Sequence, residues 1–66
     1  MPRRFIKIKE LNEITALSTA TIYRLIAEGL FPKQIKITGG KSVAWDSNDI
    51  SNWMEQRIAD SNKAAA

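Results

Sequence analysis

The chain has no cysteine and no histidine among its 66 residues. Without cysteine it can form neither a disulfide framework nor a thiolate metal site. Without histidine it lacks the commonest general base, metal ligand and pH-sensitive switch of proteins. The sequence also shows no pair of carboxylates that would be expected to face each other across a catalytic cleft. These absences make an enzyme the least favoured interpretation, and we expect no catalytic residue, metal site, cofactor or small-molecule substrate.

Long apolar runs are absent as well, since none approaches the roughly 20 residues that cross a bilayer. The first residues lack the apolar segment of a signal peptide. We therefore expect no membrane partner and a cytoplasmic location. A chain of this size forms one small domain, without room for a deep enclosed active site. We place that domain at residues 1–60 and expect residues 61–66, which end in alanines, to form a disordered tail.

The net charge of +3 is distributed unevenly along the chain. Residues 1–45 hold eight basic and three acidic residues, whereas residues 46–66 hold two basic and four acidic residues. A basic N-terminal part and a mildly acidic C-terminal part suit a protein that binds a polyanion through one of its faces. A generic charged surface is the alternative, and charge alone does not decide between them.

A short helix is predicted over residues 8–15, after a basic lead-in and a partly apolar, extended segment. Its buried side would be formed by apolar residues at helical spacing: Ile8, Leu11 and Ile14. Lys7 stands in the N-cap position, where it is a poor cap. Glu10 is placed to reach back to the Lys7 backbone N–H, as half of a capping box.

A second helix is predicted to follow a turn at residues 15–17. Ser18 is its expected N-cap, because the hydroxyl can accept a backbone N–H of the first turn. The helix ends at Glu28, where Gly29 can take the left-handed conformation that closes it. Two helices joined in this way predict a helix-turn-helix, and a plain helical hairpin is the alternative.

The second helix has an apolar face and an outward face of different character. The apolar stripe consists of Ile22, Leu25 and Ile26. Residues that point the other way, or lie near the N-terminal end, are Thr19, Ala20, Thr21, Tyr23, Arg24 and Ala27. Small residues with one aromatic and one guanidinium group suit a helix that enters the major groove of DNA. An ordinary surface helix, with a half-buried tyrosine beside the core, is the alternative.

A β-hairpin is predicted next, with a strand over residues 34–38 and a return strand over residues 43–45. The Gly39-Gly40 pair between them is a strong signal for a tight turn. The hairpin presents polar residues that could contact DNA backbone: Lys36, Lys41 and Ser42. An isolated hairpin is marginal in water, so this one must pack on the helices.

A third helix is predicted to begin after Asp46, which is a good N-cap. Its apolar stripe, expected to be buried, consists of Ile50, Trp53, Met54 and Ile58. The order helix, helix, two-stranded hairpin, helix predicts an α+β domain that is mainly α. This is the architecture of a winged helix-turn-helix.

Several short blocks stand in order between about Phe5 and Ile58: Phe5–Leu11, Leu17-Ser18, Thr21–Ile26, Gly29, Phe31–Lys33, Gly39–Trp45 and Ile50–Met54. Through these blocks the sequence resembles the AlpA family of short phage and prophage transcriptional regulators. The family is similar in fold to phage excisionases and to the DNA-binding domain of MerR-type regulators. From the resemblance we expect a transcriptional activator or repressor from a mobile element, or a factor that directs excision.

The resemblance implies that the second helix is the recognition helix and the hairpin is the wing. Carried over to this chain, the implied DNA contacts are Ser18, Thr19, Thr21, Tyr23 and Arg24 on the helix and Lys41 on the hairpin. The chain departs from the family pattern at Ala16, where Gly is common, and at Lys41, where Arg is usual. Thr19 and Ala20 stand where a basic or longer polar residue and a serine are common.

Two function classes therefore stay open from the sequence. The favoured one is a sequence-specific DNA-binding regulator or excision factor, acting on the nucleoid. Its expected partners are double-stranded DNA together with further copies of itself, RNA polymerase or an integrase, because one small domain makes few contacts. The alternative is a protein-interaction module that binds a regulator or recombinase through an apolar patch around Phe5, Ile6 and Phe31.

Overall fold

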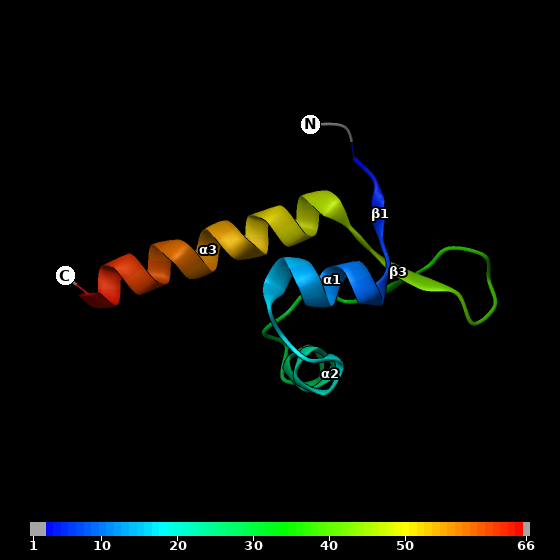
Figure 1. Ribbon diagram of the computed structural model, residues 1–66, viewed down its shortest axis with the longest axis horizontal. Coiled ribbons are helices and arrows are strands. Elements are labelled where there is room, and N and C mark those ends of the chain that lie inside the picture. The colour runs from blue at the N-terminus through cyan, green and yellow to red at the C-terminus, as the bar shows by residue number, and fades with distance from the viewer. Residues whose placement is uncertain (1–2, 66) are drawn as a thin grey trace.

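The computed structural model describes residues 3–65, and the side chains of residues 3–63. Its elements are, in chain order, β1 (Phe5–Ile6), α1 (Ile8–Thr15), α2 (Thr19–Ala27), β2 (Ile35–Lys36), β3 (Val43–Asp46) and α3 (Ser47–Ala65). In Figure 1 the loop between β2 and β3 lies at one end of the molecule, and α3 extends toward the other. The predicted class, α+β and mainly helical, is confirmed, and the fold is a winged helix-turn-helix.

The strands form one antiparallel sheet in the order β1-β3-β2. β1 pairs with β3 through Ile6 opposite Trp45, and β2 pairs with β3 through Lys36 opposite Val43. The predicted hairpin is present, but a two-stranded sheet was wrong, because β1 adds a third strand. β2 is also shorter than the strand predicted over residues 34–38. Since β1 pairs with a segment about forty residues further on, no local pattern could reveal its partner.

The core lies where α1, α2, α3 and the sheet meet. Its largest fully buried side chains are Trp45, Leu11, Ile22 and Ile50. Ile6 and Phe31 are also buried and belong to the same cluster. Each apolar side chain of this size stabilises the fold by about 1.5–3 kcal/mol when it is withdrawn from water. The patch proposed for a protein partner is therefore not a surface, because only Phe5 of its three residues is exposed.

Two tryptophans hold the loop that leads from α2 to β2. The indole N–H of Trp45 donates to the Pro32 carbonyl at 3.0 Å, and that of Trp53 donates to the Leu30 carbonyl at 2.8 Å. The Trp53 ring also packs on Phe31, with centroids 4.6 Å apart. The loop is thus fixed by polar and apolar contacts from both β3 and α3, which sets where the hairpin leaves the helices.

The N-terminus of α1 is tied down differently from the predicted capping box. The Glu10 carboxylate does not bond the Lys7 backbone; it accepts two hydrogen bonds from the Arg4 guanidinium. This bidentate bond and ion pair lower the pKa of Glu10. Arg3 pairs with the buried Asp46, with Nε and Oδ2 2.7 Å apart. The basic lead-in is therefore bound to the domain at residues 3 and 4, while Met1 and Pro2 lie outside the described residues.

α3 begins as predicted and ends later. Asp46 is its N-cap, since its carboxylate accepts the Asn48 backbone N–H at 2.8 Å. The predicted stripe is buried at Ile50 and half-buried at Trp53 and Met54. Ile58, predicted to be buried, is 61% exposed, because the second half of the helix extends past the rest of the domain (Figure 1).

The segment expected to be a disordered tail is in large part helical in the structure. Residues 61–65 form the last turns of α3, and residue 66 lies outside the described part of the chain. Alanine has the highest helix propensity of all residues, so a short alanine run can extend a helix that has already been nucleated.

Candidate nucleic-acid interface

The turn between α1 and α2 has an unusual backbone conformation and two side-chain hydrogen bonds. Ala16 takes the left-handed conformation with φ of +61°, the only residue other than glycine with positive φ between residues 3 and 65. Asn12 was not predicted to matter, yet its amide donates to the Leu17 carbonyl at 2.9 Å and accepts the Thr19 hydroxyl at 3.3 Å. Both bonds join α1 to the start of α2. A lone asparagine on a helix gives no sequence signal for such a role.

Local bonds define both ends of α2. Ser18 is the N-cap as predicted, because its Oγ accepts the Thr21 backbone N–H at 3.2 Å. At the other end, Gly29 has φ of +75° and donates to the Ile26 carbonyl, while the Leu30 N–H reaches the Leu25 carbonyl. This pair of bonds is a Schellman motif, and it places Glu28 at the C-cap. The helix is therefore nine residues long and stops abruptly.

The outward face of α2 is small and weakly polar. Ile22 is fully buried, and Leu25 and Ile26 are half-buried against the core. The exposed residues on the opposite side are Thr19, Ala20, Tyr23, Arg24 and Ala27. Apart from Tyr23 and Arg24, the exposed side chains of this face are short, so another surface can approach the backbone of the helix closely beside them.

Arg24 is the one cation on α2. Its side chain is 62% exposed and lies 3.4 Å from the Glu28 carboxylate, one turn further along the helix. An exposed pair at this spacing contributes only a few tenths of a kcal/mol. The guanidinium can therefore leave Glu28 at little cost and present its donors to another acceptor.

Tyr23 connects α2 to the sheet. Its ring meets Trp45 edge to face, with centroids 6.1 Å apart, and the side chain is 39% exposed. From the sequence, Tyr23 could either contact DNA or lie half-buried beside the core. In the structure its ring packs on Trp45, while part of the side chain stays accessible to solvent. Tyr23 places the exposed side of α2 beside the strand from which the hairpin projects.

The hairpin carries the other predicted residues. Lys36 lies on β2 opposite Val43, while Lys41 and Ser42 lie in the exposed tip that follows Gly39. The Ser42 carbonyl accepts the Ile37 N–H at 3.2 Å, which closes the tip. Within residues 3–63 the ion pairs involve Arg3, Arg4 and Arg24, so neither hairpin lysine is neutralised by a carboxylate.

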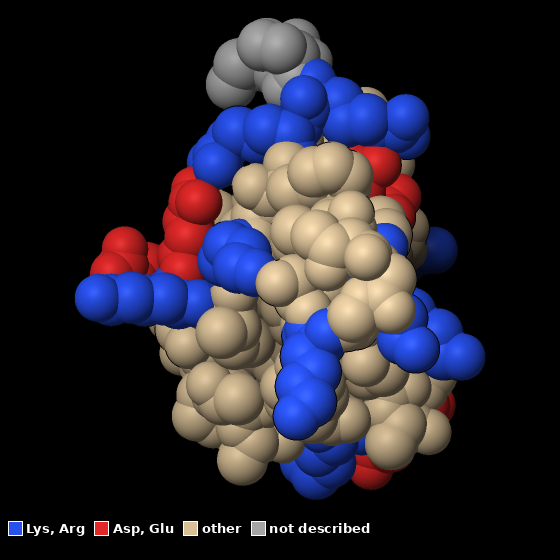
Figure 2. All heavy atoms as spheres, turned by 90° about the vertical axis from the view of Figure 1, so that its right-hand side faces the viewer, with Lys and Arg blue, Asp and Glu red and all other residues tan. Residues whose placement is uncertain are grey.

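At the end of the molecule that holds the hairpin, most of the surface is uncharged, and the charged side chains away from its margins are basic (Figure 2). Figure 2 shows lysine and arginine side chains spread over this face, separated by uncharged surface, with the acidic side chains toward its margins. The arrangement differs from the basic N-terminal part predicted from charge alone, because Arg3 and Arg4 are paired with Asp46 and Glu10.

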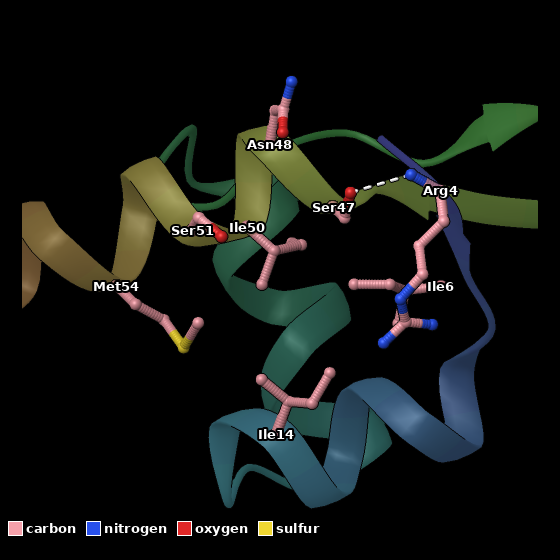
Figure 3. A pocket seen from close by; sticks show the side chains of 8 residues that line it. All are labelled: Arg4, Ile6, Ile14, Ser47, Asn48, Ile50, Ser51 and Met54. Carbon is pink, nitrogen blue, oxygen red and sulfur yellow. Dashed lines mark hydrogen bonds between the residues drawn. The ribbon is translucent and has the colours of Figure 1, made fainter. Parts of the chain in front are cut away.

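An apolar hollow lies between β1, α1 and α3. In Figure 3 the side chains of Ile6, Ile14, Ile50 and Met54 point toward it, and the Arg4 backbone N–H donates to Ser47 Oγ at its edge. Its volume is about 270 Å³. Arg4 is the only ionisable residue that lines the hollow, so nothing there supplies an acid and a base.

Two other kinds of feature are absent from the part of the chain that the structure covers. No three side chains of the metal-binding types come together there. Among residues 3–65 no helix combines the length and the apolar character needed to cross a membrane.

Comparison with known proteins identifies relatives of this sequence. Residues 4–58 match the family model described as "Prophage CP4-57 regulatory protein (AlpA)". The chain is also 45% identical over 56 residues to an uncharacterized protein, ORF88, of Enterobacteria phage P4. That match covers 85% of this chain and 62% of the phage protein, so this chain spans less than two thirds of its relative. No solved structure matches the chain.

Proposed function

The chain belongs to the AlpA family of prophage regulatory proteins, and from this membership we propose that it binds double-stranded DNA. In this proposal α2 enters the major groove and the hairpin lies on the adjacent sugar–phosphate backbone. The observation that carries it is the pairing of two exposed features. Arg24 stands on an exposed face whose other side chains, apart from Tyr23, are short. Lys36 and Lys41, which pair with no carboxylate within residues 3–63, stand on a hairpin that Trp45 joins to the same helix.

The residues predicted to contact DNA divide into three roles. Arg24 is the candidate for a base contact, which in the major groove is most often to guanine. Lys36, Lys41 and the Ser42 hydroxyl are candidates for phosphate contacts, which position the protein without reading sequence. Tyr23 is a further candidate for a phosphate contact, through its hydroxyl. Ser18 and Thr21 support the helix start, and their hydroxyls bond each other at 2.9 Å.

The test begins with selection of a bound site from a random duplex library, followed by titrations at several salt concentrations. If about four phosphates are neutralised, the logarithm of the binding constant falls against that of salt with a slope near −3.6. Lys41→Ala reduces that slope by about 0.9, whereas Arg24→Ala weakens the selected site by about 1–3 kcal/mol. Lys63→Ala is the matched control, because Lys63 lies in the last turn of α3, away from the hairpin (Figure 1).

Binding that does not depend on salt, or equal effects of Lys41→Ala and Lys63→Ala, would contradict the proposal. The second candidate is a protein-interaction module, and the observation that favours it is the apolar hollow that Ile14 and Met54 line. Capture of a regulator or recombinase that is insensitive to salt, together with no mobility shift on any duplex, would support it.

The biological role depends on where in the genome the bound DNA sequence lies. We propose a transcriptional regulator of a mobile element, or a factor that directs excision, which acts with further copies of itself, RNA polymerase or an integrase. A genomic footprint separates the roles: sites at promoters indicate regulation of transcription, and sites at attachment sequences indicate excision.

A further inference from the structure

The hydroxyl groups at the start of α2 are largely engaged within the protein. Ser18 Oγ donates to Thr21 Oγ1 at 2.9 Å and accepts the Thr21 backbone N–H at 3.2 Å. The Thr19 hydroxyl donates to Asn12 Oδ1 at 3.3 Å. Thr21 is half-buried. Two of the three hydroxyl protons at the start of α2 are therefore donated within the protein: the Ser18 proton goes to Thr21 at the helix cap, and the Thr19 proton goes to Asn12 of α1.

One exposed side chain of the first turn makes no such bond. Ala20 is the second residue of α2 and is exposed on the same side as Arg24, one turn further along the helix. Since the N-terminal residues of a recognition helix approach the base edges most closely, the group presented there is a methyl group. Thymine is the one base that carries a methyl group in the major groove, and alanine is among the residues that contact it.

On the basis of the DNA binding proposed above, we propose that Ala20 reads a thymine through contact between the two methyl groups. Four residues of helix rise about 6 Å, and one base step rises about 3.4 Å. The thymine therefore lies about two base pairs from the base that Arg24 contacts. In this arrangement α2 recognises one base through the Arg24 guanidinium and one thymine through the Ala20 methyl group. Ala20 is therefore a residue that determines sequence specificity.

The experiment uses the duplex selected by the whole chain and replaces each thymine in turn by deoxyuridine, which lacks only the methyl group. We expect deoxyuridine at one position, near the base that Arg24 contacts, to raise the Kd of the wild-type protein about fourfold. A factor of this size corresponds to the free energy of burying one methyl group. In Ala20→Gly, thymine and deoxyuridine at that position bind equally. Ala27→Gly, the matched control on the same exposed face, retains the fourfold difference.

The comparison of thymine with deoxyuridine is made within each variant, so a general loss of affinity or helix stability cancels. Specific, salt-dependent binding in which no thymine is sensitive, or equal sensitivity in wild type and Ala20→Gly, overturns the assignment of Ala20 and leaves DNA binding intact. Failure to bind any duplex overturns both.

Discussion

The ring of Tyr23 on α2 meets the ring of Trp45 on β3 at an angle of 66°, with centroids 6.1 Å apart. Trp45 is fully buried and also donates its indole N–H to Pro32. One aromatic pair thus joins the helix proposed to read bases to the strand that carries the hairpin. The two proposed contact surfaces are held in a fixed relation by this packing.

Substitutions at Tyr23 separate packing from contact. Tyr23→Ala removes the ring from Trp45 and is expected to lower the free energy of unfolding by about 1–2 kcal/mol, measured by urea titration. Tyr23→Phe keeps the ring, so stability stays within about 0.5 kcal/mol of wild type. If the hydroxyl bonds a phosphate, Tyr23→Phe weakens DNA binding by about 1 kcal/mol. Equal stability of the Ala and Phe variants would contradict the structural role of the ring.

Ser18 has a capping role that can be distinguished from a DNA contact. Ser18→Ala is expected to destabilise the domain by about 1 kcal/mol, because one N–H of the first turn loses its acceptor. Ser18→Asp retains a good cap and its stability, yet places a negative charge at the proposed interface, so DNA binding falls. Thermal unfolding and a binding titration measure the two effects. If Ser18→Asp binds DNA as tightly as wild type, the start of α2 does not lie close to the duplex.

The left-handed residue in the turn offers a stabilising substitution. Ala16 has φ of +61°, which costs an alanine about 1–2 kcal/mol relative to glycine. After allowance for the greater freedom of glycine in the unfolded chain, Ala16→Gly is expected to raise the free energy of unfolding by about 0.5–1 kcal/mol.

Gly29→Ala is the matched opposite, since Gly29 has φ of +75° and open space where a methyl group would stand. It is expected to destabilise the domain by about 1 kcal/mol through backbone strain alone. A destabilised Ala16→Gly would show that the turn has another conformation in solution.

The pair of Arg4 and Glu10 predicts a dependence of stability on acid. The Arg4 hydrogen bonds lower the pKa of Glu10 in the folded chain. A carboxylate of this kind stabilises the folded state above its unfolded pKa, about 4.3, and the effect disappears as pH falls through the lowered folded value. Glu10→Gln should therefore be less stable than wild type at neutral pH, and the difference should close in acid.

Urea titrations of both proteins between neutral pH and strong acid test this prediction. Glu13→Gln, on the same helix, controls for the loss of one negative charge. A difference between Glu10→Gln and wild type that stays constant across the acid range would mean that the ion pair does not form.

Local signals determined much of this protein from the sequence alone. Ser18, Gly29 and Asp46 act at helix ends, because capping involves residues only a few positions apart. The Gly39-Gly40 pair does lie between the hairpin strands, but in a loop over residues 37–42 that is wider than the predicted tight turn. Helical periodicity likewise predicted α1 over residues 8–15.

Only the tertiary structure decided the relations between distant segments. Arg4 bonds Ser47 across forty-three positions, β1 joins β3, and Ile58 stays exposed because α3 extends beyond the domain. The composition of the helix start suggested hydroxyls available for DNA, whereas the fold brings Asn12 to Thr19 and leaves the methyl group of Ala20 outward. Such outcomes depend on which distant segments come into contact when the chain folds. The free energy of these long-range contacts cannot be read from any short stretch of sequence.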